Sequence, residues 1–150
     1  MTIIDYLAPA LGSWQGSNGM RLRPTDDYER SAASAEVQIA ARNFIAIDYT
    51  WSTEGQAQDG LLLISDAPEP AAATADWADS WHSSESWLEF RGGLADGQLV
   101  LEASYPAPPG PDWGWQIRID PGTGDGPRIT MHNLMPEHPA YQVVELALER

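Results

Sequence analysis

The 150-residue sequence has no cysteine and no lysine. Without cysteine there is no disulfide framework, no thiolate metal site and no cysteine nucleophile. All eight basic residues are arginine, set against 22 acidic residues, and the formal net charge is −14. Such a chain has no basic stripe to neutralise phosphates, so we expect neither nucleic-acid binding nor attraction to anionic membranes. The acidity itself indicates a well-solvated surface.

Long apolar runs are also missing. No stretch approaches the ~20 residues that a membrane-spanning helix requires. The short apolar segment at residues 3–11 carries Asp5 and has no basic region before it, which argues against a signal peptide. We therefore expect a cytoplasmic protein with no membrane partner. A chain of this length suits a single domain, residues 1–150, that buries roughly 68–70% of its unfolded surface.

The sequence does contain short segments in which apolar and polar residues alternate, as in half-buried strands. The clearest, residues 113–120, alternates Trp113, Trp115, Ile117 and Ile119 with polar residues and one glycine. Further candidate strands lie at residues 14–23, 36–42, 45–51, 61–65, 87–91, 98–105, 129–133 and 141–149. These nine strands, joined mostly by short turns, predict an all-β fold: one up-and-down antiparallel barrel of about 8–10 strands. A short N-terminal helical turn precedes it.

Three segments are predicted to interrupt the strands. Residues 66–85 form a connection, in which residues 76–81 make one helical turn with Trp77 and Trp81 at positions i and i+4. Residues 58–60, Gln-Asp-Gly, carry a turn signal. Gly92-Gly93 is predicted as the turn region of a hairpin.

Two features together resemble the lipocalin-like calycins. The first is Leu11-Gly12-Ser13-Trp14-Gln15-Gly16, and the second is Arg150 at the end of the last strand. The resemblance implies that Trp14 packs at the barrel floor with Arg150 across its face, a cation–π contact worth ~0.5–2 kcal/mol. The whole chain is similar to a bacterial lipocalin-like family of unknown function, through residues 12–16, 44–49, 76–82 and 144–150.

A second resemblance is to the nitrobindin type of haem-binding barrel, which opens with Gly-x-Trp-x-Gly-x-Gly. This chain has Gly12, Trp14 and Gly16 but Asn18 at the next glycine position. The haem-ligating histidine of that family precedes an apolar strand near the C-terminus, whereas His138 lies in a Pro-Glu-His-Pro loop. Haem therefore enters only as an alternative, and no cofactor is otherwise expected.

A barrel with aromatic inner faces predicts a ligand cavity. The expected lining residues lie on the apolar faces of their strands, and Asn133 joins them because a buried amide must find hydrogen-bond partners. The candidates are Tyr49, Trp51, Tyr105, Trp113, Trp115, Met131 and Asn133. Trp77, Trp81 and Trp87 flank the irregular connection and could cover its mouth. Strand parity places Arg91 and Arg118 outside, so no inward cation for an acidic ligand is predicted.

No catalytic or metal-binding residue is predicted. Asp79, His82 and Ser83 crowd together, but no Gly-x-Ser-x-Gly motif occurs, and a polar rim segment is the preferred interpretation. His132 and His138 lack the spacing of a helical ligand pair, and residues 120–126 lack the spacing of a calcium loop.

The leading hypothesis is a barrel that binds a small hydrophobic or amphipathic molecule, as a monomer or homodimer, and is not an enzyme. One alternative is a haem-binding barrel or a barrel enzyme. The other is a non-catalytic interaction protein whose barrel is filled by its own side chains.

Overall fold

The computed structural model describes all 150 residues and contains a closed ten-stranded barrel. Every strand pairs antiparallel with its neighbours in the sequence, and β1 pairs with β10 to close the ring from Gln15–Glu149 to Met20–Val144. The up-and-down barrel predicted from the alternation is thus confirmed. The elements are α1 (Ile3–Leu7), a 3₁₀ turn (Ala8–Ala10), β1 (Gly12–Met20), β2 (Glu29–Ala40), β3 (Phe44–Thr53), β4 (Gln56–Asp66), β5 (Ala72–Asp79), β6 (Leu88–Ala95), β7 (Gln98–Tyr105), β8 (Trp113–Asp120), β9 (Arg128–Leu134) and β10 (Tyr141–Glu149).

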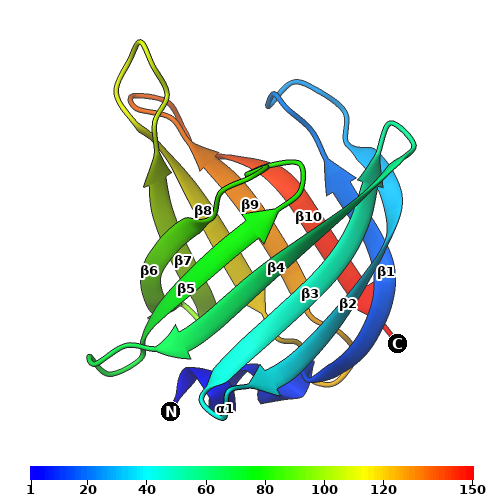
Figure 1. Ribbon diagram of the computed structural model, residues 1–150, viewed down its shortest axis with the longest axis vertical. Helices are drawn as coiled ribbons and strands as arrows, with labels where there is room; N and C mark the ends of the chain where they lie inside the picture. The colour runs from blue at the N-terminus through cyan, green and yellow to red at the C-terminus, as the bar shows by residue number, and fades with distance from the viewer.

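Helix α1 lies across one end of the barrel, where Figure 1 shows it beneath the strands. Thr2 and Asp5 form a capping box that starts the helix, and Ile3 and Leu7 are fully buried. Trp14 also lies at this closed end, where its Nε1 donates a hydrogen bond to the Ala10 carbonyl at 2.7 Å. None of the helices has the length or apolar character needed to cross a bilayer.

The Arg150 guanidinium lies 4.3 Å from the centre of the Trp14 ring. Trp14 is 1% exposed, so the cation covers an indole that is otherwise enclosed by the barrel. The contact joins the first strand to the end of the last one, at the seam where the barrel closes.

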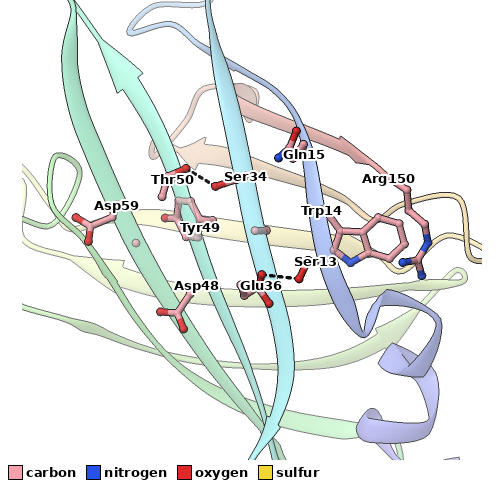
Figure 2. A pocket seen from close by; sticks show the side chains of 12 residues that line it. Ser13, Trp14, Gln15, Ser34, Glu36, Asp48, Tyr49, Thr50, Asp59 and Arg150 are labelled. Carbon is pink, nitrogen blue, oxygen red and sulfur yellow. Dashed lines mark hydrogen bonds between the residues drawn. The ribbon is translucent and has the colours of Figure 1, made fainter.

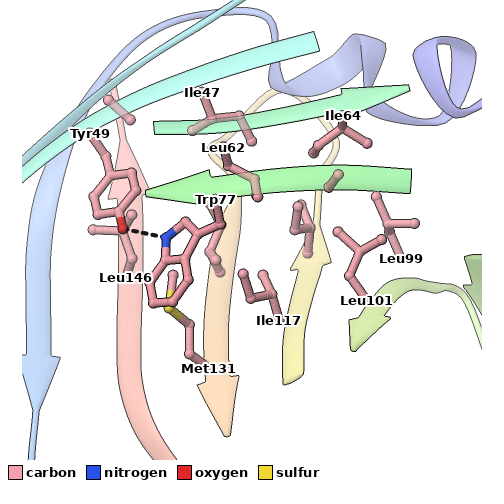
Figure 3. Packing of buried hydrophobic residues seen from close by; sticks show 14 of the residues in the cluster. Ile47, Tyr49, Leu62, Ile64, Trp77, Leu99, Leu101, Ile117, Met131 and Leu146 are labelled. Carbon is pink, nitrogen blue, oxygen red and sulfur yellow. Dashed lines mark hydrogen bonds between the residues drawn. The ribbon is translucent and has the colours of Figure 1, made fainter. Parts of the chain in front are cut away.

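The barrel interior is filled from the closed end to beyond its middle. A cluster of 29 buried residues occupies it. Figure 3 shows part of this packing, with Ile47, Leu62 and Ile117 converging on Trp77. The space open to a ligand is therefore limited to the other end of the barrel.

The prediction of an irregular connection over residues 66–85 is wrong in its centre. Residues 72–79 form strand β5, which pairs with β4 from Gly60–Asp79 to Asp66–Ala73. Ala73, Ala75 and Trp77 point inward in alternation, so Trp77 and Trp81 do not share a helical turn. The run of small alanines hid the alternation because it carries little hydrophobic contrast.

Two of the predicted turns are also wrong. Gly92 lies within β6, where a Cβ would overlap the carbonyl oxygen of Val100. Gly60 lies within β4, where a Cβ would overlap the Tyr49 ring. The actual hairpin turns are Glu54-Gly55 and Asp96-Gly97, in which both residues have positive φ, as a tight two-residue hairpin turn requires. The chain forms ten strands, one more than predicted, because β5 is a strand.

Candidate functional site

The buried carboxylate of Asp79, at the end of β5, accepts four hydrogen bonds. Its Oδ2 accepts from the Tyr49 hydroxyl at 2.6 Å and from Trp51 Nε1 at 3.2 Å. Its Oδ1 accepts from the main-chain N–H groups of Trp81, at 2.9 Å, and His82, at 3.0 Å. Asp79 is 2% exposed, and a carboxylate so placed is stable only because donors replace its water. It ties strand β3 to the segment that follows β5.

Tyr49 extends this network into the core. Figure 3 shows its hydroxyl facing Trp77, whose Nε1 donates to it at 2.9 Å. Burial, and then the neighbouring Asp79 carboxylate, raises the pKa of Tyr49 well above its usual value. The phenol therefore stays protonated and donates to Asp79 while it accepts from Trp77.

Residues 80–87 form a loop that folds back over the open end of the barrel. Ser83 Nα and Ser84 Nα both donate to the Asp79 carbonyl, at 3.1 and 3.0 Å, and Asp79 Nα donates to Ser83 Oγ at 2.8 Å. Ser86 Oγ donates to the Ser83 carbonyl at 3.3 Å. Asp79 thus holds the start of this loop through both its side chain and its main chain.

The loop places the His82 imidazole among four tryptophan rings. Its centre lies 5.3 Å from Trp51 and 4.9 Å from Trp81. Trp77 and Trp115 lie at 5.9 and 5.4 Å and stack on each other at 5.6 Å with an angle of 12°. Burial lowers the pKa of His82, and the Asp79 carboxylate opposes this to a smaller extent. The ring is therefore neutral at pH 7.

Beside His82 is a pocket of about 300 Å³ at the mouth of the barrel. Its walls come from β5, β6, β7, β8 and the two loops above them. They are Trp77, His82, Ser83, Ser86, Leu88, Tyr105, Pro106 and Trp115. The indole N–H of Trp115 is buried and has no hydrogen-bond partner in the protein. A buried donor without an acceptor costs ~1–3 kcal/mol.

The structure separates the predicted lining residues into three groups. Tyr105 and Trp115 line the mouth pocket, and Trp113 packs against Tyr105 at 6.4 Å. Tyr49 and Trp51 are buried in the Asp79 network behind it. The other two predicted lining residues, Met131 and Asn133, lie in β9. Met131 is buried in the core. Asn133 is occupied within the protein, because its Oδ1 accepts from the Tyr105 hydroxyl at 2.7 Å and its Nδ2 donates to the Tyr141 hydroxyl.

Sequence reasoning placed Trp77 only as a cover of the mouth and the Asp79–Ser83 segment only as a polar rim, and it gave Ser86 and Leu88 no role in the pocket wall. The available signal was the alternation of inward side chains along residues 72–79, which ends in Trp77 and Asp79. It indicates that the residues after Asp79 begin at the mouth of the barrel. His82 carried no comparable signal, because a loop has no fixed periodicity to say where a side chain points.

The larger hollow on the molecule is an open groove of about 740 Å³ on the outer face of β1 to β4. Figure 2 shows it bordered by the carboxylates of Glu36, Asp48 and Asp59, with Arg150 at one end. Ser34 and Thr50 hydrogen-bond across its floor at 2.6 Å. The groove is polar and shallow, and no group of three or more metal-ligating side chains occurs anywhere in the structure. It has no buried unpaired group comparable with Trp115.

The residues present do not fit a haem. His132 lies on the outer face of β9, between Gln116 and Gln142 of the adjacent strands, and His138 is exposed in the 135–140 loop. His82 alone lies inside, but it is hemmed in by tryptophan rings and borders a pocket at the lower end of the ~300–1,000 Å³ range of small-molecule sites. A macrocycle would require the Asp79-anchored loop to be displaced.

The crowded Asp79–Ser83 segment does not form a catalytic triad. Asp79 accepts from the main-chain N–H of His82 rather than from its imidazole, and Ser83 Oγ donates to the Asp79 carbonyl at 3.2 Å. A nucleophilic serine would instead need to donate to the imidazole. The segment orders the loop.

Comparisons with known proteins agree with this architecture. A crystal structure of Rv2717c from M. tuberculosis superposes with a TM-score of 0.65, covers 98% of this chain and 96% of its own, and is 16% identical in sequence. At that identity the likeness shows the shared fold. A comparison with curated proteins finds no significant relative. The model of one family, DUF1579, described as a protein of unknown function, matches residues 5–150, and the chain therefore belongs to the DUF1579 family.

Proposed function

We propose that this protein binds a small, mainly apolar aromatic molecule in the pocket at the mouth of its barrel. The observation that carries the proposal is the pocket of about 300 Å³ at the mouth, whose walls include the rings of Trp77, Tyr105 and Trp115. Burial of apolar ligand surface against these rings contributes roughly 25 cal/mol per Å² to binding.

The shape of the pocket favours a flat ligand. Trp77, Trp115 and the His82 imidazole present ring faces and edges within 6 Å of one another, and Tyr105 and Leu88 complete the wall. Aromatic pairs prefer offset-stacked or edge-to-face contacts, which a planar molecule can make with several of these rings at once. The volume of about 300 Å³ limits the ligand to one or two fused rings with small substituents.

The lipocalin-like relationship belongs to the same proposal. It is supported by the barrel topology and by the contact between Arg150 and Trp14 near the Gly12-x-Trp14 motif. Lipocalin-like barrels hold ligands inside, whereas here the deep interior is filled and only the mouth is open. This filling also favours the competing function, an interaction protein that holds no ligand.

The indole N–H resonances of the protein test the proposal. We expect a panel of one- and two-ring aromatic compounds to shift the Trp115 signal, assigned as the one missing in Trp115→Phe. This variant replaces the indole in the pocket wall with a smaller ring, and the lost contact area should weaken binding by about three- to ten-fold. Trp113→Phe, outside the pocket wall, is the matched control and should bind normally. If no compound shifts the signal at millimolar concentration, the filled-barrel interaction protein is the better interpretation.

A further inference from the structure

The wall of the mouth pocket contains aromatic rings and no charged side chain. The rings are those of Trp77, Tyr105 and Trp115, and the polar members of the wall beside them are His82 and two serines. Burial lowers the pKa of His82, so its imidazole adds no positive charge at neutral pH. The wall therefore has no cation that would attract an anionic ligand or repel a cationic one.

The aromatic rings of this wall are not used by cations of the protein. The face of a tryptophan or tyrosine ring attracts a cation within about 6 Å of its centre, and tryptophan does so most strongly. The protein makes three such contacts, all from arginines, and they involve the rings of Trp14 and Tyr28. The rings of the mouth pocket take part in none of them, so their attraction is available to a bound molecule.

The connections at the open end of the barrel are acidic. Helix α1 precedes β1 at the closed end and each strand is antiparallel to the next, so the connections after β1, β3, β5, β7 and β9 lie at the open end (Figure 1). The connection after β1, residues 21–28, has two arginines and two aspartates. The other four have no arginine or lysine and carry one exposed carboxylate each: Glu54, Glu85, Asp112 and Glu137.

Two of these acidic connections also form part of the pocket wall. They are residues 80–87, which carry Glu85, and residues 106–112, which carry Asp112. The arginines of the adjacent strands, Arg91 and Arg118, are exposed on the outer face of the barrel. The formal charge of the whole molecule is −14, so the potential at the mouth is negative and favours a cationic ligand over an anionic one.

The wall also distinguishes between kinds of cation. A primary ammonium has three N–H donors, and each needs an acceptor when the group leaves water. The carboxylate of Asp79 already accepts four hydrogen bonds, and no other carboxylate belongs to the wall. A cation without N–H groups needs no acceptor, and aromatic rings are sufficient to stabilise it.

We infer that the ligand of the mouth pocket is an organic cation without N–H groups, an N-methylated aromatic ring or a quaternary ammonium, that binds against Trp77, Tyr105 and Trp115. This assignment rests on the proposed function and adds the charge of the ligand. The acidic connections increase the local concentration of the cation, and the aromatic wall binds it.

Isothermal titration calorimetry at pH 8 and low salt tests the assignment with three two-ring probes of similar size. The probes are 1-methylquinolinium, which is a permanent cation, 4-methylquinoline, which is neutral at this pH, and 1-naphthoate, which is an anion. We expect the cation to bind about ten-fold more tightly than the neutral probe, and the anion to bind most weakly.

Replacement of all tryptophans by 5-fluorotryptophan tests the contribution of the rings in the full chain. Fluorine withdraws electron density from the indole and leaves its shape almost unchanged. The affinity for 1-methylquinolinium should fall by about two- to three-fold, whereas the affinity for 4-methylquinoline should stay the same.

Glu85→Gln tests the contribution of the acidic connections. It removes one negative charge beside the pocket and should lower the affinity for 1-methylquinolinium by about two-fold at low salt, with no effect on the neutral probe. Glu69→Gln is the matched control, because Glu69 is exposed in the connection between β4 and β5 at the closed end. Its affinity for the cation should equal that of the wild type.

The outcomes distinguish the charge of the ligand from the pocket function. Equal binding of the cation and the neutral probe, or tightest binding of 1-naphthoate, would overturn the cationic assignment and leave a pocket for aromatic molecules. A preference for the cation that is unchanged by 5-fluorotryptophan and lost at about 150 mM NaCl would also overturn it, because it would show general attraction to an acidic protein. If none of the three probes binds, both the pocket function and the cationic ligand are excluded.

Discussion

The side chain of Asp79 accepts more hydrogen bonds than that of any other polar residue of the barrel. It is buried, and its carboxylate receives two side-chain and two main-chain donors. Removal of this acceptor leaves the buried Tyr49 and Trp51 donors and two partly buried amides without partners. The cost of such losses comes from donors left buried and unpaired rather than from the carboxylate itself.

Asp79→Ala is accordingly expected to lower the free energy of unfolding by about 3 kcal/mol, measured by urea denaturation. Asp79→Asn keeps one oxygen and should fall between this variant and the wild type. Asp76→Ala is the matched control, because Asp76 is exposed on the same strand, and its effect should stay within about 0.5 kcal/mol. Equal stability of Asp79→Ala and Asp76→Ala would show that the four hydrogen bonds contribute nothing.

At the scale of the strand, β4 is shaped by the absence of a side chain at one position. Gly60 faces the barrel interior opposite Tyr49 in the paired strand, and the Tyr49 ring lies over its Cα. This close approach lets the phenol reach Asp79 on β5, two strands away from its own. A glycine within a strand usually weakens it, and here the aromatic ring fills the space that a side chain would occupy.

We expect Gly60→Ala to destabilise the protein by about 1–3 kcal/mol, since the buried Tyr49 ring would have to shift to make room for the added Cβ. Thermal unfolding followed by circular dichroism measures the change. The Tyr49 hydroxyl should also lose its short bond to Asp79, visible as a shift of its side-chain resonances. Gly110→Ala, in the open 106–112 loop, meets nothing closer than 3.9 Å and serves as control. If Gly60→Ala leaves the stability unchanged, the Tyr49 ring is free to move.

At the scale of the whole molecule, the barrel is held together against its own charge. The formal net charge is −14, and the structure contains only three ion pairs, two of which share Glu145. Packing of the buried cluster and continuous strand pairing must therefore supply the stability, with unfavourable long-range repulsion to overcome. Salt screens this repulsion over a Debye length of ~30 Å at 0.01 M and ~8 Å at 0.15 M.

An increase in NaCl from about 10 mM to about 150 mM should therefore raise the melting temperature by a few degrees. Differential scanning calorimetry provides the measurement, and a series in which sulfate replaces chloride at equal ionic strength separates screening from ion-specific effects. A fall in melting temperature with added NaCl would indicate that the three ion pairs outweigh the general repulsion. The chain should also show no salt-dependent binding to duplex DNA.

Much of the barrel could be predicted from the sequence because alternation with a period of two directly reports which side of a strand is buried. Strands β8 and β10 were predicted with their observed bounds at residues 113–120 and 141–149. Strand β5 was missed, since alanine is too small to mark an inner face. Gly60 and Gly92 were assigned to turns because glycine has the same sequence signature in a turn and under a close contact.

The sequence by itself determined the fold class, because strand alternation and short connections leave an antiparallel barrel as the simplest closed solution. It also placed Tyr105 and Trp115 on inward faces. The tertiary structure decided which part of the interior stays open and which polar groups lack partners there. That depends on side chains from four strands and on two loops, whose course no periodicity records. His82 reaches Trp115 only because Asp79 folds residues 80–87 back over the mouth.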